Sequence, residues 1–165
     1  MRGMLLGVAA VLAALAGPAA ATEEAAGEGV ATVHVMRHLH TPAGQPDPDL
    51  LPEGKAAADA LVGWFEGKEL AAIYASPFKR TGATVAPLAA ARGLPVKAYD
   101  PRDMAALLAR VRAEAGPVLV VGHSNTVPDI VAGLGAERPG PIAHGDFGDI
   151  WTVAGGRVVR ERVVR

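Results

Sequence analysis

Apolar positions along the chain fall into two kinds of segment, short runs rich in Val and Ile and longer stretches with apolar residues at helical spacing. The short runs predict strands and the longer stretches predict helices. The predicted strands are residues 30–36, 70–75, 96–99 and 117–121. The predicted helices are residues 53–65, 77–92, 103–115 and 127–134, with Ser76 as the N-cap and Pro77 as the first residue of the second, and Asp103 as the cap of the third.

The end of the chain has a different pattern. Residues 149–153 and 158–163 are two further apolar runs, and the Ala-Gly-Gly-Arg turn between them predicts a closing hairpin. Strands that alternate with helices indicate a mostly parallel sheet. We therefore expect an α/β fold: a single three-layer domain with the sheet flanked by helices and a C-terminal hairpin. The most apolar strand, residues 117–121, is expected at the centre of the sheet.

The first 21 residues follow the order of a secretory signal peptide. Arg2 is followed by an apolar run over residues 4–16 and by small residues at Ala19 and Ala21. The run is short for a membrane span, although an uncleaved anchor is the alternative. The predicted organisation is a signal peptide at 1–21, a flexible leader at 22–29 and a domain at 30–165. The mature protein is expected to be periplasmic or secreted, with no stable membrane insertion.

Composition and charge exclude several classes of function. The chain of 165 residues suits one domain, and its formal net charge of −1 provides no basic field for nucleic acid. It contains no cysteine, which excludes disulfides, thiolate metal sites and a cysteine nucleophile. An anionic ligand would therefore have to be held by a local cluster of side chains.

Such a cluster is predicted where three strands end. Arg37 and His38 follow the first strand, Arg80 lies in the segment after the second, and His123 follows the central one. The carboxyl ends of parallel strands form the ligand-binding edge of such sheets. Guanidinium forks suit phosphate oxygens, and nearby positive charge keeps an imidazole neutral, as attack on phosphorus requires. These residues could bind a phosphoryl group without a metal.

Three motifs in this order resemble the histidine phosphatase superfamily, the phosphoglycerate mutase-like enzymes. The first is Arg37-His38-Leu39-His40-Thr41, the second is Ser76-Pro77-Phe78-Lys79-Arg80 with Thr84, and the third is an apolar strand leading to Gly122-His123. The loop at residues 50–54 also looks like the family's entry into the first helix. The resemblance extends from residue 33 to about residue 153.

The resemblance implies a histidine acid phosphatase-like phosphomonoester hydrolase. His38 would become a phosphohistidine that water then hydrolyses, with Arg37, Arg80 and His123 holding the phosphate oxygens. Thr41, Ser124 and Asn125 would bind substrate in the same pocket. The expected partner is a small phosphorylated substrate or phosphate, and neither a metal nor another cofactor is expected.

Two features depart from the family pattern. Leu39 and His40 stand where the family has small or acidic residues, which predicts a differently shaped pocket floor. Ser124 follows the second histidine, so the general acid would have to come from the region after the third strand, where Asp100 and Asp103 lie; Asp103 is equally well explained as a helix cap. Without a well-placed acid, only substrates with good leaving groups would turn over quickly.

Two other functions are compatible with these residues. The pocket could bind a phosphorylated ligand without turning it over. Alternatively, His34, His38 and His40 share the parity of one strand face and, with His123 or His144, could form the site of a histidine-rich metal-binding protein. The ordinary interpretation of His34 is a structural strand residue and that of His144 a solvent-facing loop residue. Substrate specificity would come from the loops at residues 43–52 and 136–147.

Overall fold

The computed structural model describes residues 31–163, so the predicted signal peptide and leader lie outside the described residues. The described elements, in chain order, are β1 (Val33–Arg37), α1 (Pro52–Trp64), β2 (Ala72–Ala75), α2 (Lys79–Arg92), β3 (Val96–Ala98), α3 (Met104–Arg112), β4 (Val118–Gly122), α4 (Val127–Gly133), β5 (Asp149–Ala154) and β6 (Arg157–Arg162). Among the helices of residues 31–163, none is both long enough and apolar enough to cross a membrane.

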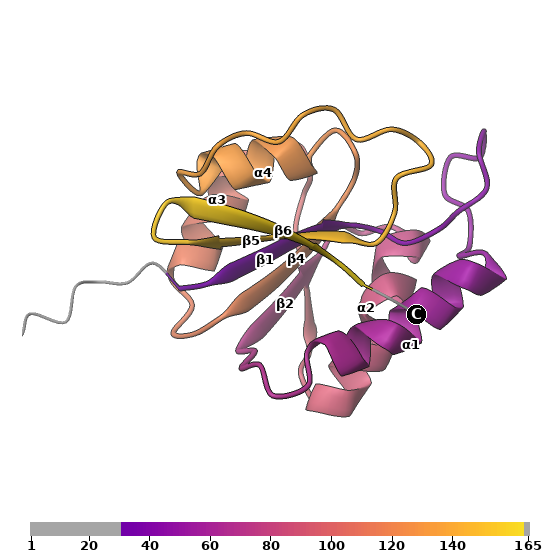
Figure 1. Cartoon of the computed structure of the whole chain (residues 1–165), viewed down its shortest axis with the longest axis horizontal. Helices are drawn as coiled ribbons and strands as arrows, with labels where there is room; N and C mark the ends of the chain where they lie inside the picture. The colour runs from indigo at the N-terminus through magenta and orange to yellow at the C-terminus, as the bar shows by residue number, and fades with distance from the viewer. Residues whose placement is uncertain (1–30, 164–165) are drawn as a thin grey trace, which may run out of the picture.

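Residues 31–163 form a six-stranded sheet in the order β3-β2-β4-β1-β5-β6. The first four strands in this order are parallel, whereas β5 runs antiparallel to β1 and forms a hairpin with β6. Helices α1 and α2 cover one face of the sheet and α3 and α4 cover the other (Figure 1). The predicted α/β architecture, with a single three-layer domain and a C-terminal hairpin, is confirmed.

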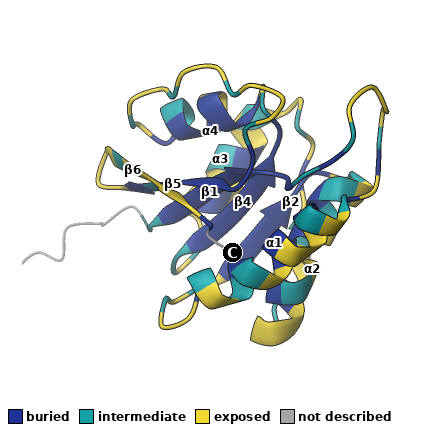
Figure 2. Cartoon of the chain, turned by 45° about the vertical axis from the view of Figure 1, so that its right-hand side comes forward, coloured by how far each residue is buried: buried dark blue, intermediate teal, exposed yellow. Residues whose placement is uncertain are grey.

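Each face of the sheet has its own apolar core. Met36 and Leu119 pack with α1 and α2 on one face. Val35 and Val120 pack with α3 and α4 on the other. All five residues of β4 are buried, so the prediction that this strand is central is correct; Figure 2 shows the inner strands dark blue between helices with exposed outer faces. Burying each large side chain stabilises the fold by roughly 1.5–3 kcal/mol, which holds the strand ends in place.

The start of α2 differs from the prediction. The helix begins at Lys79 rather than at Pro77, and its N-cap residue, Phe78, provides no side-chain hydrogen bond. The Ser76 hydroxyl does not cap the helix because it is hydrogen-bonded to His123. Instead, the carboxylate of Asp47 accepts hydrogen bonds from the backbone N–H of Lys79 at 3.1 and 3.3 Å. A side chain from a distant loop thus takes the role that the sequence assigned to Ser76.

The remaining boundaries agree with the predictions to within three residues. Asp103 caps α3, since its carboxylate accepts the N–H of Ala106 at 3.0 Å. That helix ends at Arg112 rather than at residue 115. The hairpin turns at Gly155 and Gly156, whose positive φ angles of 54° and 75° suit a tight turn between antiparallel strands.

Helix α1 approaches the segment after β1 very closely. The N–H of Leu51 donates to the carbonyl oxygen of His40 at 2.9 Å. A Cβ atom on Gly54 would lie 2.6 Å from the same oxygen, well inside van der Waals contact. Glycine at position 54 therefore lets the helix pack against the backbone that follows His38.

Candidate active site

The carboxyl ends of β1, β2 and β4 bring the three motif segments together. The N–H of His38 donates to the carbonyl oxygen of Gly122 at 2.9 Å, and the N–H of Ser76 donates to that of Val121 at 3.4 Å. The ring centroids of His38 and His123 are 5.4 Å apart. Strand pairing therefore places both histidines at one edge of the sheet.

His38 is held as a neutral imidazole with a defined tautomer. Its Nδ1 lies 2.9 Å from the carbonyl oxygen of Leu39, and because a carbonyl can only accept, Nδ1 carries the proton. Burial lowers the pKa of His38 to about 3; the Leu39 bond opposes this, and the positive charges of Arg37 and Arg80 add to it. The lone pair on Nε2 is therefore the one left to attack an electrophile.

His123 has the opposite tautomer. Its Nδ1 lies 3.3 Å from Nη2 of Arg80, and a guanidinium can only donate, so Nδ1 accepts. Its Nε2 then carries the proton and donates to the Ser76 hydroxyl at 2.7 Å, which in turn donates to Thr81 Oγ1 at 3.3 Å. Burial and the two site arginines lower the pKa of His123 to about 4, while Asp47 opposes the shift.

Arg37 is fixed from two directions. Its Nη1 donates to three carbonyl oxygens of the loop before β5, those of Ala143 at 2.8 Å, His144 at 3.1 Å and Asp146 at 3.2 Å. Its guanidinium lies 4.1 Å from the centroid of the Phe147 ring. Within the described residues, the buried Nε has no hydrogen-bond acceptor. The loop before β5 thus holds the Arg37 guanidinium in a fixed position.

Arg80 is held by the loop that follows β1. Its Nη1 donates to the carbonyl oxygen of Pro46 at 2.9 Å and to the Asp47 carboxylate at 3.2 Å. The guanidinium also lies 4.5 Å from the centroid of the Phe78 ring. These contacts, together with its bond to His123, hold the Arg80 guanidinium beside the histidines.

The residues enclose a cavity of about 230 Å³. It is lined by Arg37, His38, Thr41, Pro42, Gly44, Gln45, Pro48, Arg80 and His144. Two positive charges and a neutral imidazole line it, and fixed donors of this kind stabilise the negative charge of an anion. The cavity can therefore bind a phosphoryl group and support transfer of that group to His38.

Not all the predicted site residues meet at this cavity. Thr41 is buried and lines it. Ser124 and Asn125 instead line a separate hollow of about 380 Å³ beside Pro128, so the structure does not place them with the substrate. Leu39 is fully buried in the apolar core under α1 and α2, so it does not reshape the pocket floor as expected.

The two proposed general acids also lie elsewhere. Asp100 follows β3, the edge strand, and its carboxylate binds the side chain and the N–H of Arg102. Asp103 serves as the cap of α3. Two strands, β2 and β4, separate β3 from β1, so neither carboxylate lines the cavity that contains His38.

His34 is not part of the cluster either. Its Nδ1 lies 3.0 Å from the Thr152 hydroxyl, and its ring packs edge-on against Trp64 and Phe65 at the far end of α1. The alternation of side chains along one strand would place His34 and His38 on the same face, but β1 ends at Arg37, so His38 lies outside the strand. Residues 31–163 contain no group of three His, Asp or Glu side chains arranged to hold a metal ion.

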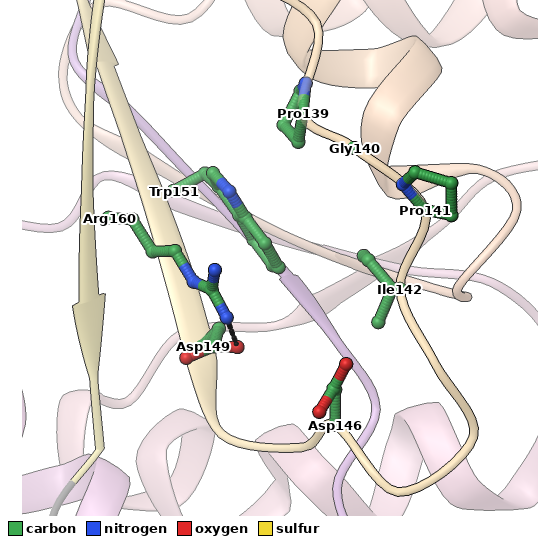
Figure 3. Close-up of a pocket in the computed structure, with 8 residues that line it drawn as sticks. All are labelled: Pro139, Gly140, Pro141, Ile142, Asp146, Asp149, Trp151 and Arg160. Carbon is green, nitrogen blue, oxygen red and sulfur yellow. Dashed lines mark hydrogen bonds and ion pairs between the residues drawn. The ribbon is translucent and has the colours of Figure 1, made fainter.

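A second hollow, of about 200 Å³, lies between the loop at residues 136–147 and the β5–β6 hairpin (Figure 3). Trp151 and Asp146 line it, and Asp149 beside them is bonded to Arg160. Asp146 thus has two roles: its carbonyl oxygen accepts from Arg37, whereas its carboxylate accepts the N–H of Ala143 and lines this second hollow. The loop therefore presents carbonyls to Arg37 but no carboxylate to the cavity that contains His38.

Sequence reasoning missed three contributors to the site. Asp47 anchors Arg80, Phe147 contacts Arg37, and His144 lines the cavity. The His144 side chain is exposed, as predicted, and it also lines the cavity. No sequence motif marks these three residues. The one signal in the sequence is that they lie in the loops at residues 43–52 and 136–147, which are predicted to set substrate specificity.

Comparison with known proteins agrees with the geometry. The family model of the histidine phosphatase superfamily (branch 1) matches residues 33–102. Curated protein sequences include no match to this chain.

Solved structures share the fold at low sequence identity. The protein histidine phosphatase SixA complexed with tungstate has a TM-score of 0.60 at 21% identity, covering 79% of this chain and 94% of its own. A mycobacterial glucosyl-3-phosphoglycerate phosphatase has a TM-score of 0.62 at 16% identity, covering 80% and 97%. A phosphoserine phosphatase from Entamoeba histolytica in complex with 3-phosphoglyceric acid has a TM-score of 0.62 at 16% identity, covering 82% and 98%. The matched segment includes the first two motifs, so residues 33–102 are similar to the histidine phosphatase superfamily, and the chain shares the fold of these solved structures.

Proposed function

We propose that this chain is an exported, metal-independent phosphatase that hydrolyses phosphorylated substrates through a phosphohistidine on His38. One observation carries the proposal: His38 is buried, neutral and fixed through Nδ1, so that Nε2 is left to react in a cavity shared with Arg37 and Arg80. A positioned neutral nucleophile beside two fixed cations is what phosphoryl transfer requires.

In the first step, Nε2 of His38 attacks phosphorus, the bond from phosphorus to the leaving oxygen breaks, and its electron pair leaves with that oxygen. Arg37 and Arg80 stabilise the charge on the equatorial oxygens. His123 holds Arg80 through Nδ1, so it contributes by orienting that guanidinium.

In the second step, a water oxygen attacks the phosphorus of the phosphohistidine, and the water releases one proton, which balances the negative charge that departed with the leaving oxygen. The bond from phosphorus to nitrogen breaks and its electron pair returns to Nε2 of His38, which regenerates the neutral imidazole. The Nδ1–H bond to Leu39 keeps the ring in position through both steps. The two steps together consume one water and release phosphate and the leaving group.

The substrate class is a small phosphorylated molecule or an exposed phosphoryl group on a larger one. The similar structures include a protein histidine phosphatase, a sugar-derivative phosphatase and a phosphoserine phosphatase, so the fold accommodates different leaving groups. The charges of Arg37 and Arg80 act on the phosphoryl oxygens where other phosphatases use a metal ion. This supports activity without a metal.

Export is proposed from the N-terminal pattern alone. The short positive start, the apolar run and the small residues at Ala19 and Ala21 favour cleavage and a periplasmic or secreted mature protein. Sequencing the N-terminus of the protein recovered from its native host checks this. A mature start near Thr22 is expected, and full-length protein in the cytosol would contradict the proposal.

The activity is tested with residues 22–165 and p-nitrophenyl phosphate, with and without EDTA. We expect release of p-nitrophenol that EDTA does not reduce, and its loss in His38→Asn. His34→Asn is the matched control, because His34 is a buried histidine of the same sheet that lies outside the cavity. Loss of activity with EDTA would contradict the mechanism. A folded protein that binds phosphate or vanadate but releases no product would instead be a phospho-ligand binding protein.

A further inference from the structure

The cavity that contains His38 has a nucleophile and two cations but no carboxylate. Asp47 is bonded to Arg80 and to the N–H of Lys79, and the carboxylate of Asp146 is bonded to the N–H of Ala143 and lines the second hollow. Neither lines the cavity. A leaving group that departs as an alkoxide needs a proton, and none of these acids is placed to supply it.

His144 is the remaining cavity-lining residue with a side chain suited to proton transfer. Within residues 31–163, the cavity is otherwise lined by the two arginines, by His38 and by residues without an acidic or basic side chain. Histidine is the side chain that most often transfers protons in enzymes. No hydrogen bond or ion pair to another described residue engages the His144 ring, so it is available to a substrate.

The backbone of His144 is fixed to the catalytic apparatus. Its carbonyl oxygen accepts from Nη1 of Arg37 at 3.1 Å. Its ring centroid lies 6.0 Å from that of Phe147, and the Phe147 ring lies 5.9 Å from the His38 ring. One aromatic side chain thus borders both imidazoles and the Arg37 guanidinium, which restricts where the His144 ring can lie.

The two histidines differ in burial. Both histidines line the cavity, but His38 is only 5% exposed whereas His144 is exposed. In an in-line displacement the leaving group departs on the side of phosphorus opposite the nucleophile. Because His38 is the buried lining residue, a leaving group departs towards the more exposed lining of the cavity, to which His144 belongs.

We propose that His144 is the general acid of this phosphatase, an inference that rests on the function proposed above. As Nε2 of His38 forms its bond to phosphorus, the protonated His144 ring donates a proton to the leaving oxygen. The ring then accepts a proton from the water that attacks the phosphohistidine, and returns to its starting state. One proton is donated and one recovered in each turnover.

The test compares the wild-type enzyme with His144→Gln on substituted phenyl phosphates of similar shape. The ratio kcat/KM is measured because it covers the steps up to formation of the phosphohistidine. For 2,4-dinitrophenyl phosphate, whose leaving group needs no proton, we expect a loss below about threefold. For phenyl phosphate we expect a loss of about 100-fold or more, the usual contribution of a general acid.

The control variant is Glu137→Gln, an exposed change in the same loop outside the cavity, which should behave as wild type with both substrates. An equal loss on both substrates would show that His144 only binds substrate, and an unchanged kcat/KM would show that it has no role. Either result overturns the assignment while the phosphatase function stands. A wild-type enzyme that hydrolyses neither substrate would overturn the phosphatase function itself, and the assignment with it.

Discussion

At the residue scale, two buried histidines at one edge of the sheet have opposite tautomers. His38 carries its proton on Nδ1 and leaves Nε2 to attack, whereas His123 carries its proton on Nε2 and accepts from Arg80. The difference follows from the partners: a carbonyl oxygen for one ring, and a guanidinium and a hydroxyl for the other. Their roles in the proposed reaction follow from these bonds.

The Ser76 hydroxyl is therefore a positioning group, and Ser76→Ala tests this. The change removes the acceptor of the His123 Nε2 proton, so the ring and the Arg80 guanidinium lose their fixed orientation. Because small misplacements are costly in phosphoryl transfer, we expect kcat to fall on the order of tenfold. The control is Ser124→Ala, a serine that lines a different hollow and should leave kcat unchanged. Equal kcat values for Ser76→Ala and wild type would contradict the role.

The residues at strand ends could be predicted from the sequence, whereas their partners could not. Arg37, His38 and His123 follow short apolar runs, and parallel strands place such positions at one edge. Ser124 and Asn125 follow the same strand as His123, yet the turn into α4 directs them to another hollow. Asp47 and Phe147 contact the arginines only through the tertiary fold, which no local pattern encodes.

At the element scale, the loop between β1 and α1 supports the start of α2. The sequence Ser76-Pro77 is typical of a helix start, but tertiary contacts outweigh this local preference because Ser76 bonds to His123. The Asp47 carboxylate supplies the missing cap and also an ion pair at 3.2 Å to Arg80. One side chain thus connects helix stability to the catalytic cluster.

Asp47→Ala should reduce both the stability of the protein and its catalytic activity. We expect a loss of about 1 kcal/mol in the free energy of unfolding, the usual value of a helix cap, and a fall in kcat/KM on the order of tenfold as Arg80 loses its anchor. Urea unfolding and steady-state kinetics measure the two effects. Asp49→Ala, in an exposed position of the same loop, is the control and should change neither. An unaltered kcat/KM in Asp47→Ala would show that Arg80 does not depend on the loop.

Gly54→Ala tests the packing of α1 against the segment after β1. Alanine is favoured over glycine in a helix by about 1 kcal/mol, but its Cβ would lie 2.6 Å from the backbone oxygen of His40, which cannot easily move. Overpacking of this kind costs roughly 1–3 kcal/mol, so we expect net destabilisation in urea. Gly63→Ala is the control, because a Cβ there contacts nothing within 4 Å and should be neutral or stabilising. A stabilised Gly54→Ala would contradict the close approach.

At the scale of the whole molecule, the sheet order and the burial of its histidines affect stability as well as function. The alternation of strands and helices and the apolar character of β4 predict the layers and the central strand. The order of the helix-connected strands and the antiparallel placement of β5 beside β1 come from long-range pairing, which local patterns do not specify. The same pairing buries His34, His38 and His123 in neutral form.

The burial of these histidines predicts a stability that falls in mild acid. Their pKa values are lowered from 6.5 to about 4, 3 and 4, so the unfolded chain binds more protons than the folded one below pH 6.5. Stability is therefore highest above pH 6.5 and is lost as the pH falls towards 4, by up to about 1.4 kcal/mol per pH unit for each histidine. Urea unfolding between pH 7.5 and 4.5 measures the slope.

His34→Gln provides the matched comparison for this slope. Glutamine can keep the hydrogen bond to Thr152 without titrating. The number of protons that the chain takes up on unfolding in mild acid, which sets the slope, should therefore decrease by about one. A flat stability profile between pH 6.5 and 4.5 in the wild-type protein would show that these histidines are not held neutral.

The most direct test of the central claim is to trap the phosphoenzyme. The wild-type protein and His38→Asn are incubated with a ³²P-labelled substrate, quenched, and analysed by mass spectrometry for the position of the phosphoryl group. We predict label on His38 that is stable in alkali and labile in acid, and no label in the variant. Turnover without label on His38, or turnover that persists in His38→Asn, would contradict the phosphohistidine mechanism.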